Sequence, residues 1–184
     1  MIRVSAGNLK GRRLKTPVNW TGRPTTEMVK GALFNILAPV LEGSRFLDLF
    51  AGCGNVGIEA LSRGARTAFF VEKDPRAVRI IAENLRILSL SAFARVMRDD
   101  VFVAVKKLGR KGERFEVIFL DPPYGRHMEV PVMEAIAKSG LLQPEGVLIA
   151  ESTKREVLPF RINGLVLVRQ EKYGDTMLTF YKEG

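Results

Sequence analysis

The amino-acid sequence predicts an α/β fold with a mostly parallel sheet, helices on both of its faces and an antiparallel hairpin at the C-terminal end. From residue 45 onward, short apolar segments alternate with segments of helical periodicity, as is typical of parallel sheets. The last two apolar segments flank Gly174-Asp175, a sequence that favours a hairpin turn. The chain has 184 residues, 46% of them apolar, which suits one globular domain with a sizeable core.

The N-terminal part of the chain is predicted to form a small basic extension, residues 1–24, ahead of the main domain, residues 25–184. Two short strands are expected at residues 2–5 and about 13–16, because glycines and an asparagine that favour turns lie between them. A loop is expected to follow and to lead into the main domain.

The main domain is predicted to open with a helix. Thr25 or Thr26 can cap it, and its apolar residues recur at helical spacing from Val29 to Val40. Pro39 lies near the end of this helix, so its last turn is not assigned.

Strands and helices then alternate in a regular order. The predicted strands lie at residues 46–50, 67–71, 94–97, 115–120, 146–151, 165–173 and 176–181. The predicted helices lie at residues 56–62, 75–88, 101–108 and about 130–138. Ligands of such sheets bind beyond the carboxyl ends of the parallel strands, so the loops that follow these strands are the candidate site.

Charge is concentrated at the N-terminus. The chain contains 29 Lys and Arg against 20 Asp and Glu, a net charge of +9. Glu27 is the one acidic residue among the first thirty, which contain the basic residues Arg3, Lys10, Arg12, Arg13, Lys15, Arg23 and Lys30. A basic arm of this kind predicts a polyanionic partner such as nucleic acid; the alternative is a merely solvated surface.

Several classes of protein are not expected. No apolar run approaches the ~18 residues of a membrane span, and the first residues lack the apolar region of a signal peptide. A single cysteine excludes an intrachain disulfide, and with a single histidine it argues against a metal centre. We therefore expect a cytoplasmic protein with no metal, and nothing indicates an obligate dimer, so a monomer is expected.

A glycine-rich loop follows the first strand of the main domain. Gly52, Gly54 and Gly57 match the pattern G-x-G-x-x-G, and Glu72 follows the next strand, as in dinucleotide-binding sites. Asp48 argues against a dinucleotide, because a carboxylate near the start of the helix would repel a pyrophosphate. The same carboxylate would attract a ligand that carries an ammonium group.

S-adenosylmethionine has such a group, together with a sulfonium, a ribose and an adenine. Asp48 could hold its amino group while the glycines admit the ligand to the backbone. Glu72 could accept both ribose hydroxyls, and Asp100 the adenine amino group. Asp99 is a competing choice for the adenine, since Asp100 could simply cap the helix that follows it.

A second loop, Asp121-Pro122-Pro123-Tyr124, directly follows the strand at residues 115–120. The two prolines stiffen the turn and leave carbonyls free to accept hydrogen bonds. An ionised Asp121 is an acceptor only, and Tyr124 offers a flat face. These groups suit a planar substrate with an amino group, held so that its nitrogen lone pair faces a methyl donor.

With both loops in view, the chain resembles the class I S-adenosylmethionine-dependent methyltransferases. More closely, it resembles the RsmD-type enzymes, which make N2-methylguanine in 16S ribosomal RNA. The likeness covers nearly the whole chain and rests on the segments IRVSAGNLKGRRL, RPTTEMVKGALFNIL, FLDLFAGCGNVGIEALSRGA, VEKD and FLDPPY. The combination of these segments is specific to this family, whereas the pattern G-x-G-x-x-G alone is weak evidence for it. The resemblance implies the Rossmann-like fold of this class, a seven-stranded, mostly parallel sheet with the C-terminal hairpin.

The resemblance also implies a role for individual residues. The methionine half of the donor would be lined by Asp48, Phe50, Ala51, Gly52, Gly54 and Gly57. Glu72 would bind the ribose, and Asp100 with Val101 the adenine. The guanine amino group would be presented by Asp121, Pro122, Pro123 and Tyr124. Contacts to RNA are expected from Arg3, Lys10, Arg12, Arg13, Lys15, Arg23 and Thr25.

The expected partner is 16S ribosomal RNA, as the small subunit or an assembly intermediate of it. Two alternatives stay open. The first is another amino-N-methyltransferase, acting on adenine N6 in RNA or DNA or on protein glutamine, although glutamine enzymes usually carry asparagine at the position of Asp121. The second is a non-catalytic RNA-binding assembly protein. A dehydrogenase is disfavoured by Asp48 and by the proline loop.

Overall fold

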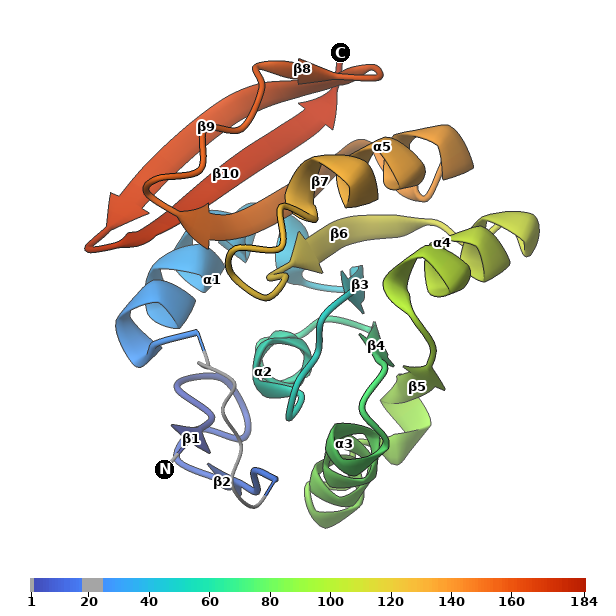
Figure 1. Ribbon diagram of the computed structural model, residues 1–184. Helices are drawn as coiled ribbons and strands as arrows, with labels where there is room; N and C mark the ends of the chain where they lie inside the picture. The colour runs from blue at the N-terminus through green and yellow to red at the C-terminus, as the bar shows by residue number, and fades with distance from the viewer. Residues whose placement is uncertain (1, 18–24) are drawn as a thin grey trace.

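The computed structural model describes residues 2–17 and 25–184. An eight-stranded sheet with the order β5-β4-β3-β6-β7-β10-β9-β8 runs through the main body (Figure 1). Its strands are β3 (Arg45–Asp48), β4 (Thr67–Glu72), β5 (Ala94–Arg98), β6 (Phe115–Leu120), β7 (Leu142–Thr153), β8 (Arg161–Ile162), β9 (Leu165–Tyr173) and β10 (Thr176–Glu183). Strands β3 to β7 pair in parallel, whereas β10, β9 and β8 are antiparallel.

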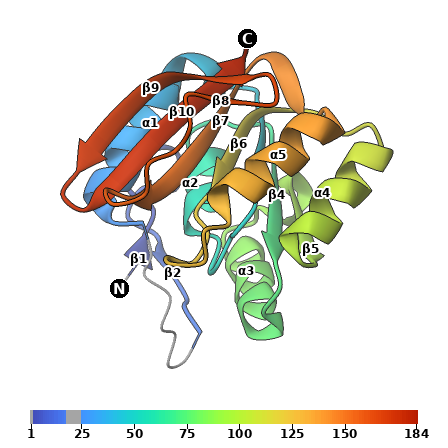
Figure 2. The same ribbon diagram turned by 45° about the horizontal axis from the view of Figure 1, so that its top comes forward.

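Helices cover both faces of the sheet (Figures 1 and 2). They are α1 (Glu27–Leu41), α2 (Asn55–Ser62), α3 (Pro75–Ile87), α4 (Val101–Arg110) and α5 (Glu129–Ser139). The first three share one apolar cluster with the sheet, and the last two share a second one. Phe46 and Leu47, neighbours in β3, belong to different clusters, because successive side chains of a strand point to opposite faces. The α/β prediction is therefore confirmed.

The structure differs from the sequence-based prediction in three details. The sheet has an eighth strand, β8, which is only two residues long and therefore leaves little periodic signal. Strand β7 begins at Leu142 rather than Gly146, because a register irregularity opposite residues 115–117 accommodates Pro144. Helix α1 continues past Pro39 to Leu41, whose burial, together with that of Leu37, favours the last turn.

A small antiparallel pair, β1 (Ile2–Arg3) with β2 (Arg13–Leu14), forms the N-terminal arm. The backbone amides of Ser5 and Ala6 donate to the Glu59 carboxylate at 2.8 and 3.0 Å. Glu59 is fully buried and lies 3.3 Å from the equally buried ammonium of Lys30. The arm is thus fastened to α2 and α1 by a buried charged network, which fixes its position beside the loop that precedes α2.

The strand order of the sheet reverses between β3 and β6, although the two strands are parallel. From β3 the chain passes to β4 on one side, and it later returns to β6 on the other side. The loops after these two neighbouring strands therefore leave the same edge of the sheet at adjacent positions, which is where ligands of doubly wound sheets bind. The two loops singled out from the sequence are these two.

Candidate active site

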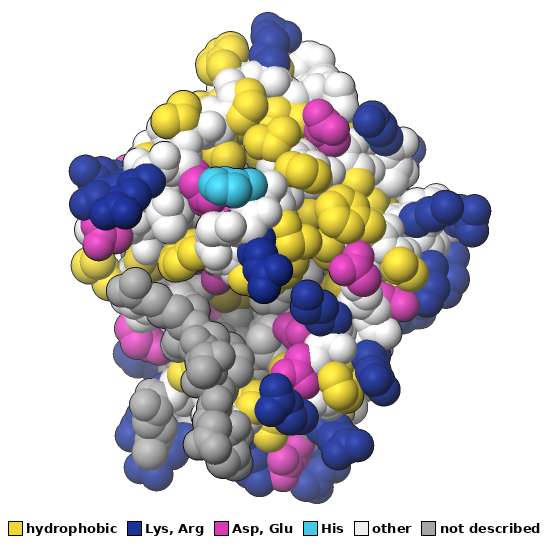
Figure 3. All heavy atoms as spheres, in the orientation of Figure 1, with side chains coloured by type: hydrophobic (Ala, Val, Ile, Leu, Met, Phe, Trp, Pro, Cys, Tyr) yellow, Lys and Arg dark blue, Asp and Glu magenta, His cyan; other side chains and the backbone are white. Residues whose placement is uncertain are grey.

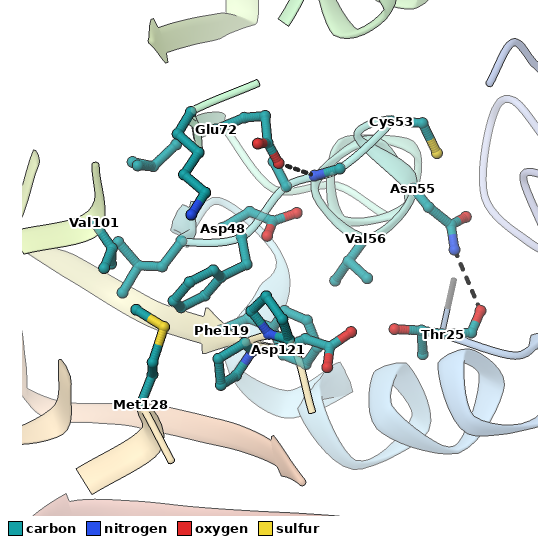
Figure 4. A pocket seen from close by; sticks show the side chains of 18 of the residues that line it. Thr25, Asp48, Cys53, Asn55, Val56, Glu72, Val101, Phe119, Asp121 and Met128 are labelled. Atoms are coloured by element: carbon teal, nitrogen blue, oxygen red, sulfur yellow. Dashed lines mark hydrogen bonds between the residues drawn. The ribbon is translucent and has the colours of Figure 1, made fainter. Parts of the chain in front are cut away.

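A cavity of about 240 Å³ opens at this edge of the sheet. It is lined by residues from the ends of β3, β4, β5 and β6 and from the start of α1 (Figure 4). Of the residues expected to bind the donor or the acceptor, it includes Asp48, Phe50, Ala51, Gly52, Glu72, Asp100, Val101, Asp121, Pro122, Pro123, Tyr124 and Thr25. Gly54 and Gly57 are not among the lining residues.

These two glycines shape the loop instead. Gly54 adopts a left-handed conformation (φ +85°) at the start of α2, which favours glycine. A side chain at Gly57 would meet the ring of Phe70 at 2.3 Å. The Gly57 amide donates to the Asp48 carboxylate at 3.1 Å, so close packing of α2 on β4 holds the loop against Asp48.

Asp48 is the most deeply buried acid of the cavity, with 1% of its surface exposed. One carboxylate oxygen accepts from Gly57, whereas the other, Oδ1, has no hydrogen-bond partner within the described part of the chain. Burial raises the pKa of Asp48 to about 7, and the charge of Glu72 contributes in the same direction. A buried carboxylate with one unsatisfied oxygen is suited to a cationic donor.

Glu72 closes the glycine loop from the end of β4. Its two oxygens accept from the backbone amides of Gly52 and Asp74, both at 2.9 Å. Each oxygen can accept a second hydrogen bond, so this carboxylate can receive ligand hydroxyls while it holds the loop.

Two aspartates lie after β5, at the end of the cavity near Val101. Asp100 caps α4, since its side chain accepts from the Phe102 amide at 2.9 Å. Asp99 pairs with the Lys107 ammonium at 2.7 Å. Both line the cavity together with the buried Val101. The capping role considered for Asp100 is thus present, and either aspartate is in a position to face a ligand.

The second loop lies at the opposite end of the cavity. Asp121 follows β6, Pro122 is buried, and Tyr124 is 40% exposed. Burial and the neighbouring carboxylates of Glu151 and Asp48 raise the pKa of Asp121 well above its usual range. An accumulation of carboxylates at a cavity wall favours cationic ligands and hydrogen-bond donors.

Sequence reasoning did not single out Glu151. This residue lies near the end of the buried part of β7 with 3% of its surface exposed, and its carboxylate accepts from the Thr25 hydroxyl at 2.9 Å. Its one signal in the sequence is an acidic residue at the end of an apolar strand. Asn55 was also missed: it joins the Lys30 ammonium, 2.8 Å away, to the Thr25 carbonyl, 3.4 Å away.

The described basic residues of the arm that are expected to bind RNA are exposed to solvent. Arg3, Lys10, Arg12, Arg13 and Lys15 are all exposed, and the Lys15 ammonium pairs with the Glu83 carboxylate. Arg23 lies outside the described residues. Lys and Arg side chains are spread widely over the face of the molecule that shows this edge of the sheet (Figure 3).

Across residues 2–17 and 25–184, no cluster of three or more His, Cys, Asp or Glu has the arrangement of a metal site. In the same two ranges, no helix is both long enough and apolar enough to cross a membrane.

Comparison with known proteins identifies the family of this chain. Residues 2–182 match the family described as "Conserved hypothetical protein 95". The chain belongs to this family. It is 39% identical to YlbH of Bacillus subtilis (strain 168), which is named provisionally as an rRNA methyltransferase, over 99% of both chains. It is 34% identical to "Ribosomal RNA small subunit methyltransferase D" of Escherichia coli (strain K12), over 98% of this chain and 89% of that one. The assignment to the RsmD-type family is confirmed.

A solved structure supports the fold of this family member. The Escherichia coli protein yhhF, named provisionally as a methyltransferase, superposes with a TM-score of 0.87 at 33% identity, over 99% of this chain and 97% of that one. The predicted class I methyltransferase fold is thereby confirmed. The sheet differs from the seven-stranded prediction by the short eighth strand, β8.

Proposed function

We propose that this protein transfers the methyl group of S-adenosylmethionine to the exocyclic N2 amino group of a guanine in 16S ribosomal RNA. One observation carries the proposal: a deeply buried carboxylate with an unsatisfied oxygen, Asp48, and the Asp121-Pro122-Pro123-Tyr124 loop line the same cavity. The first suits a cationic donor and the second an amino acceptor. The names of the relatives support ribosomal RNA as the class of substrate.

S-adenosylmethionine is the methyl donor, and the residues of the cavity fit it. Asp48 Oδ1 would receive the ammonium group. Glu72 would accept from the ribose hydroxyls, and Asp100 or Asp99 from the adenine amino group. A positive ligand beside Asp48 and Asp121 would lower the raised pKa of each carboxyl. The buried carboxyls therefore disfavour ionisation in the free protein, and binding of the cationic donor favours it.

The acceptor end positions the amino group. When bound, S-adenosylmethionine supplies a methyl group that its positive sulfur has already activated. Asp121 and the Pro122 carbonyl would accept the two amino hydrogens, while the base stacks on Tyr124. This arrangement would point the nitrogen lone pair at the donor, and such orientation is the main contribution required from the protein. After transfer, the acidic nitrogen can release its proton to Asp121 or to water.

The basic arm would hold the RNA while one base leaves its stack. Extruding a base costs about a few kcal/mol, which contacts elsewhere must offset. Lys10, Arg12 and Arg13 are exposed on the arm that the Glu59 network fastens beside the cavity. We assign them to the phosphate backbone of the small subunit or of an assembly intermediate, with the enzyme acting as a cytoplasmic monomer. The division of the chain at residue 24 lies outside the described residues and stays a prediction.

The test is a labelling experiment. The protein is incubated with isotopically methyl-labelled S-adenosylmethionine and either unmodified small ribosomal subunits or naked 16S RNA, and the digested RNA is analysed by mass spectrometry. Labelled N2-methylguanosine at one position is the expected product. Labelled N6-methyladenosine would support methyl transfer to an amino group but contradict guanine as the target base. RNA binding without label would favour a non-catalytic assembly protein.

A further inference from the structure

Two carboxylates lie side by side at the acceptor end of the cavity. In the parallel register of β6 and β7, Leu120 pairs with Ala150. Asp121 is the first residue after β6, and Glu151 is the residue of β7 that follows Ala150, so the two are neighbours at this edge of the sheet. Burial and, after it, the negative charge of Glu151 raise the pKa of Asp121, which agrees with this proximity.

Thr25 lies against this pair from the start of α1. Its hydroxyl donates to the Glu151 carboxylate at 2.9 Å, and the whole residue is only 6% exposed. Thr25 lines the cavity, and its side chain and that of Asp121 point toward one another (Figure 4). The Thr25 hydroxyl is therefore next to the group that would receive the amino nitrogen.

The hydrogen bond to Glu151 fixes the polarity of Thr25. A hydroxyl has one proton and two lone pairs, and here the proton is directed at Glu151. The Thr25 oxygen consequently presents lone pairs to the cavity. Once the cationic donor lowers the pKa of Asp121 and this carboxyl is ionised, this part of the wall accepts hydrogen bonds and does not donate them.

The bases differ in what lies next to their amino group. In guanine the N2 amino group is adjacent to N1–H, a donor. In adenine and cytosine the ring nitrogen next to the amino group is an acceptor, which would face the Thr25 lone pairs. A site built to bind a donor rejects an analogue that lacks it by as much as about 10⁴-fold, because its polar groups are left unpaired.

We propose that Thr25 reads the N1–H of the target guanine and that Glu151 is the positioning residue that keeps the Thr25 oxygen an acceptor. The inference rests on the proposed function and adds to it the device that selects the base. A purely structural role, in which the Thr25–Glu151 bond only fastens the start of α1 to β7, would affect stability and all substrates alike.

The experiment uses RNA in which the methylated guanine, located by the labelling experiment, is replaced by 2-aminopurine through splinted ligation. This analogue keeps the C2 amino group, but its N1 carries no proton. Single-turnover methylation of both RNAs is compared for the wild-type protein and for Thr25→Val, Thr25→Ser, Glu151→Met and Glu151→Gln. Affinity for S-adenosylhomocysteine and the melting temperature are measured on each variant.

The wild-type protein is expected to methylate guanine at least about 100-fold faster than 2-aminopurine. Thr25→Val and Glu151→Met should reduce this ratio about tenfold or more through a slower reaction on guanine, with affinity for S-adenosylhomocysteine kept. Thr25→Ser and Glu151→Gln retain the hydroxyl and an acceptor for its proton, so the ratio should persist.

Equal loss on both RNAs in Thr25→Val would overturn the inference and leave the function intact, as would a wild-type protein that does not discriminate. Failure of the wild-type protein to methylate any guanine would instead overturn the proposed function, and this inference with it. If Glu151→Met does not fold, Thr25→Val against Thr25→Ser still decides the question.

Discussion

The two ends of the cavity are built in different ways. At the donor end, the carboxylates of Asp48 and Glu72 are held by backbone amides of the same glycine loop and its surroundings. At the acceptor end, Thr25, Asp121 and Glu151 come from distant parts of the chain, and the Thr25 hydroxyl donates to the Glu151 carboxylate, a hydrogen bond between two side chains. The donor end is therefore organised around the backbone of one glycine loop, whereas the acceptor end depends on side chains from distant segments.

This difference predicts how mutations act. Changes at the donor end should alter ligand affinity and stability together, because the same contacts hold the loop and the ligand. Changes at the acceptor end should alter the reaction while donor binding and folding persist.

The largest expected effect is that of Asp121→Asn on the rate. The amide keeps the shape of the side chain but replaces one acceptor oxygen by a donor, which opposes the amino hydrogens. We expect a loss of about 10²- to 10³-fold in single-turnover rate, the usual cost of removing one hydrogen bond that orients the transition state. Calorimetry should find unchanged affinity for S-adenosylhomocysteine; a loss of affinity would mean that the two ends are not separable.

Glu72→Ala should act in the opposite way to Asp121→Asn, because it should weaken donor binding. Loss of a charged hydrogen-bond acceptor costs about 1.5–3 kcal/mol, so affinity for S-adenosylhomocysteine should fall about 10- to 100-fold by calorimetry. The melting temperature should fall as well, because the amides of Gly52 and Asp74 lose their partner. Glu83→Ala, which removes an exposed carboxylate paired with Lys15, is the control and should leave affinity unchanged.

The same contrast explains what the sequence could reveal. The glycine loop, Glu72 and the proline loop are contiguous motifs at the ends of predicted strands, so their place in one cavity followed from the rule for parallel sheets. Glu151 has no such motif, because its neighbours Asp121 and Thr25 are brought to it only by the pairing of β6 with β7 and by the position of α1. The roles of Gly54 and Gly57 in packing rather than lining also depend on a tertiary contact, with Phe70.

Gly57→Ala tests whether packing at the donor end controls binding. The added methyl group would meet the buried Phe70 ring at 2.3 Å, and such overpacking costs about 1–3 kcal/mol of unfolding free energy. Because the Gly57 amide also donates to Asp48, donor affinity should fall in parallel. Gly31→Ala is the matched helical control: nothing lies within 4 Å of its added carbon, so stability should rise by about 0.5–1 kcal/mol. Equal effects of both variants would show that the contact with Phe70 is unimportant.

The raised pKa of Asp48 predicts that the stability of the protein depends on pH. Its pKa is about 7 in the folded protein, above the ordinary 3.8, so the folded state binds the proton more tightly than the unfolded one. Ionisation of Asp48 therefore lowers the free energy of unfolding. This effect is absent below about pH 4 and grows as pH rises to about 7, by at most about 1.4 kcal/mol per pH unit. Denaturant unfolding should show that the free energy of unfolding changes less with pH, between pH 5 and 7, in Asp48→Asn than in the wild-type protein.

The matched control for this slope is Asp74→Asn. The pKa of Asp74 is lowered, mainly by its hydrogen bonds with Arg76, so this carboxyl stays ionised above pH 5 in both states. Its replacement can change stability through the cap of α3 but should leave the slope between pH 5 and 7 intact. An unchanged slope in Asp48→Asn would place the titration at Asp121 or Glu129, since burial raises the pKa of both of these carboxyls as well.

The smallest effect is expected at the arm, where single charges meet RNA. Lys10 is exposed and forms no recorded ion pair within the described residues, whereas the Lys15 ammonium pairs with Glu83. Each phosphate contact contributes about 0.7 to the slope of log affinity against log salt for single-stranded RNA. Lys10→Ala should therefore reduce this slope by about that amount in filter binding. Lys15→Ala should reduce it less, because Glu83 already offsets its charge, and equal reductions would show that RNA displaces Glu83 and recruits the whole arm.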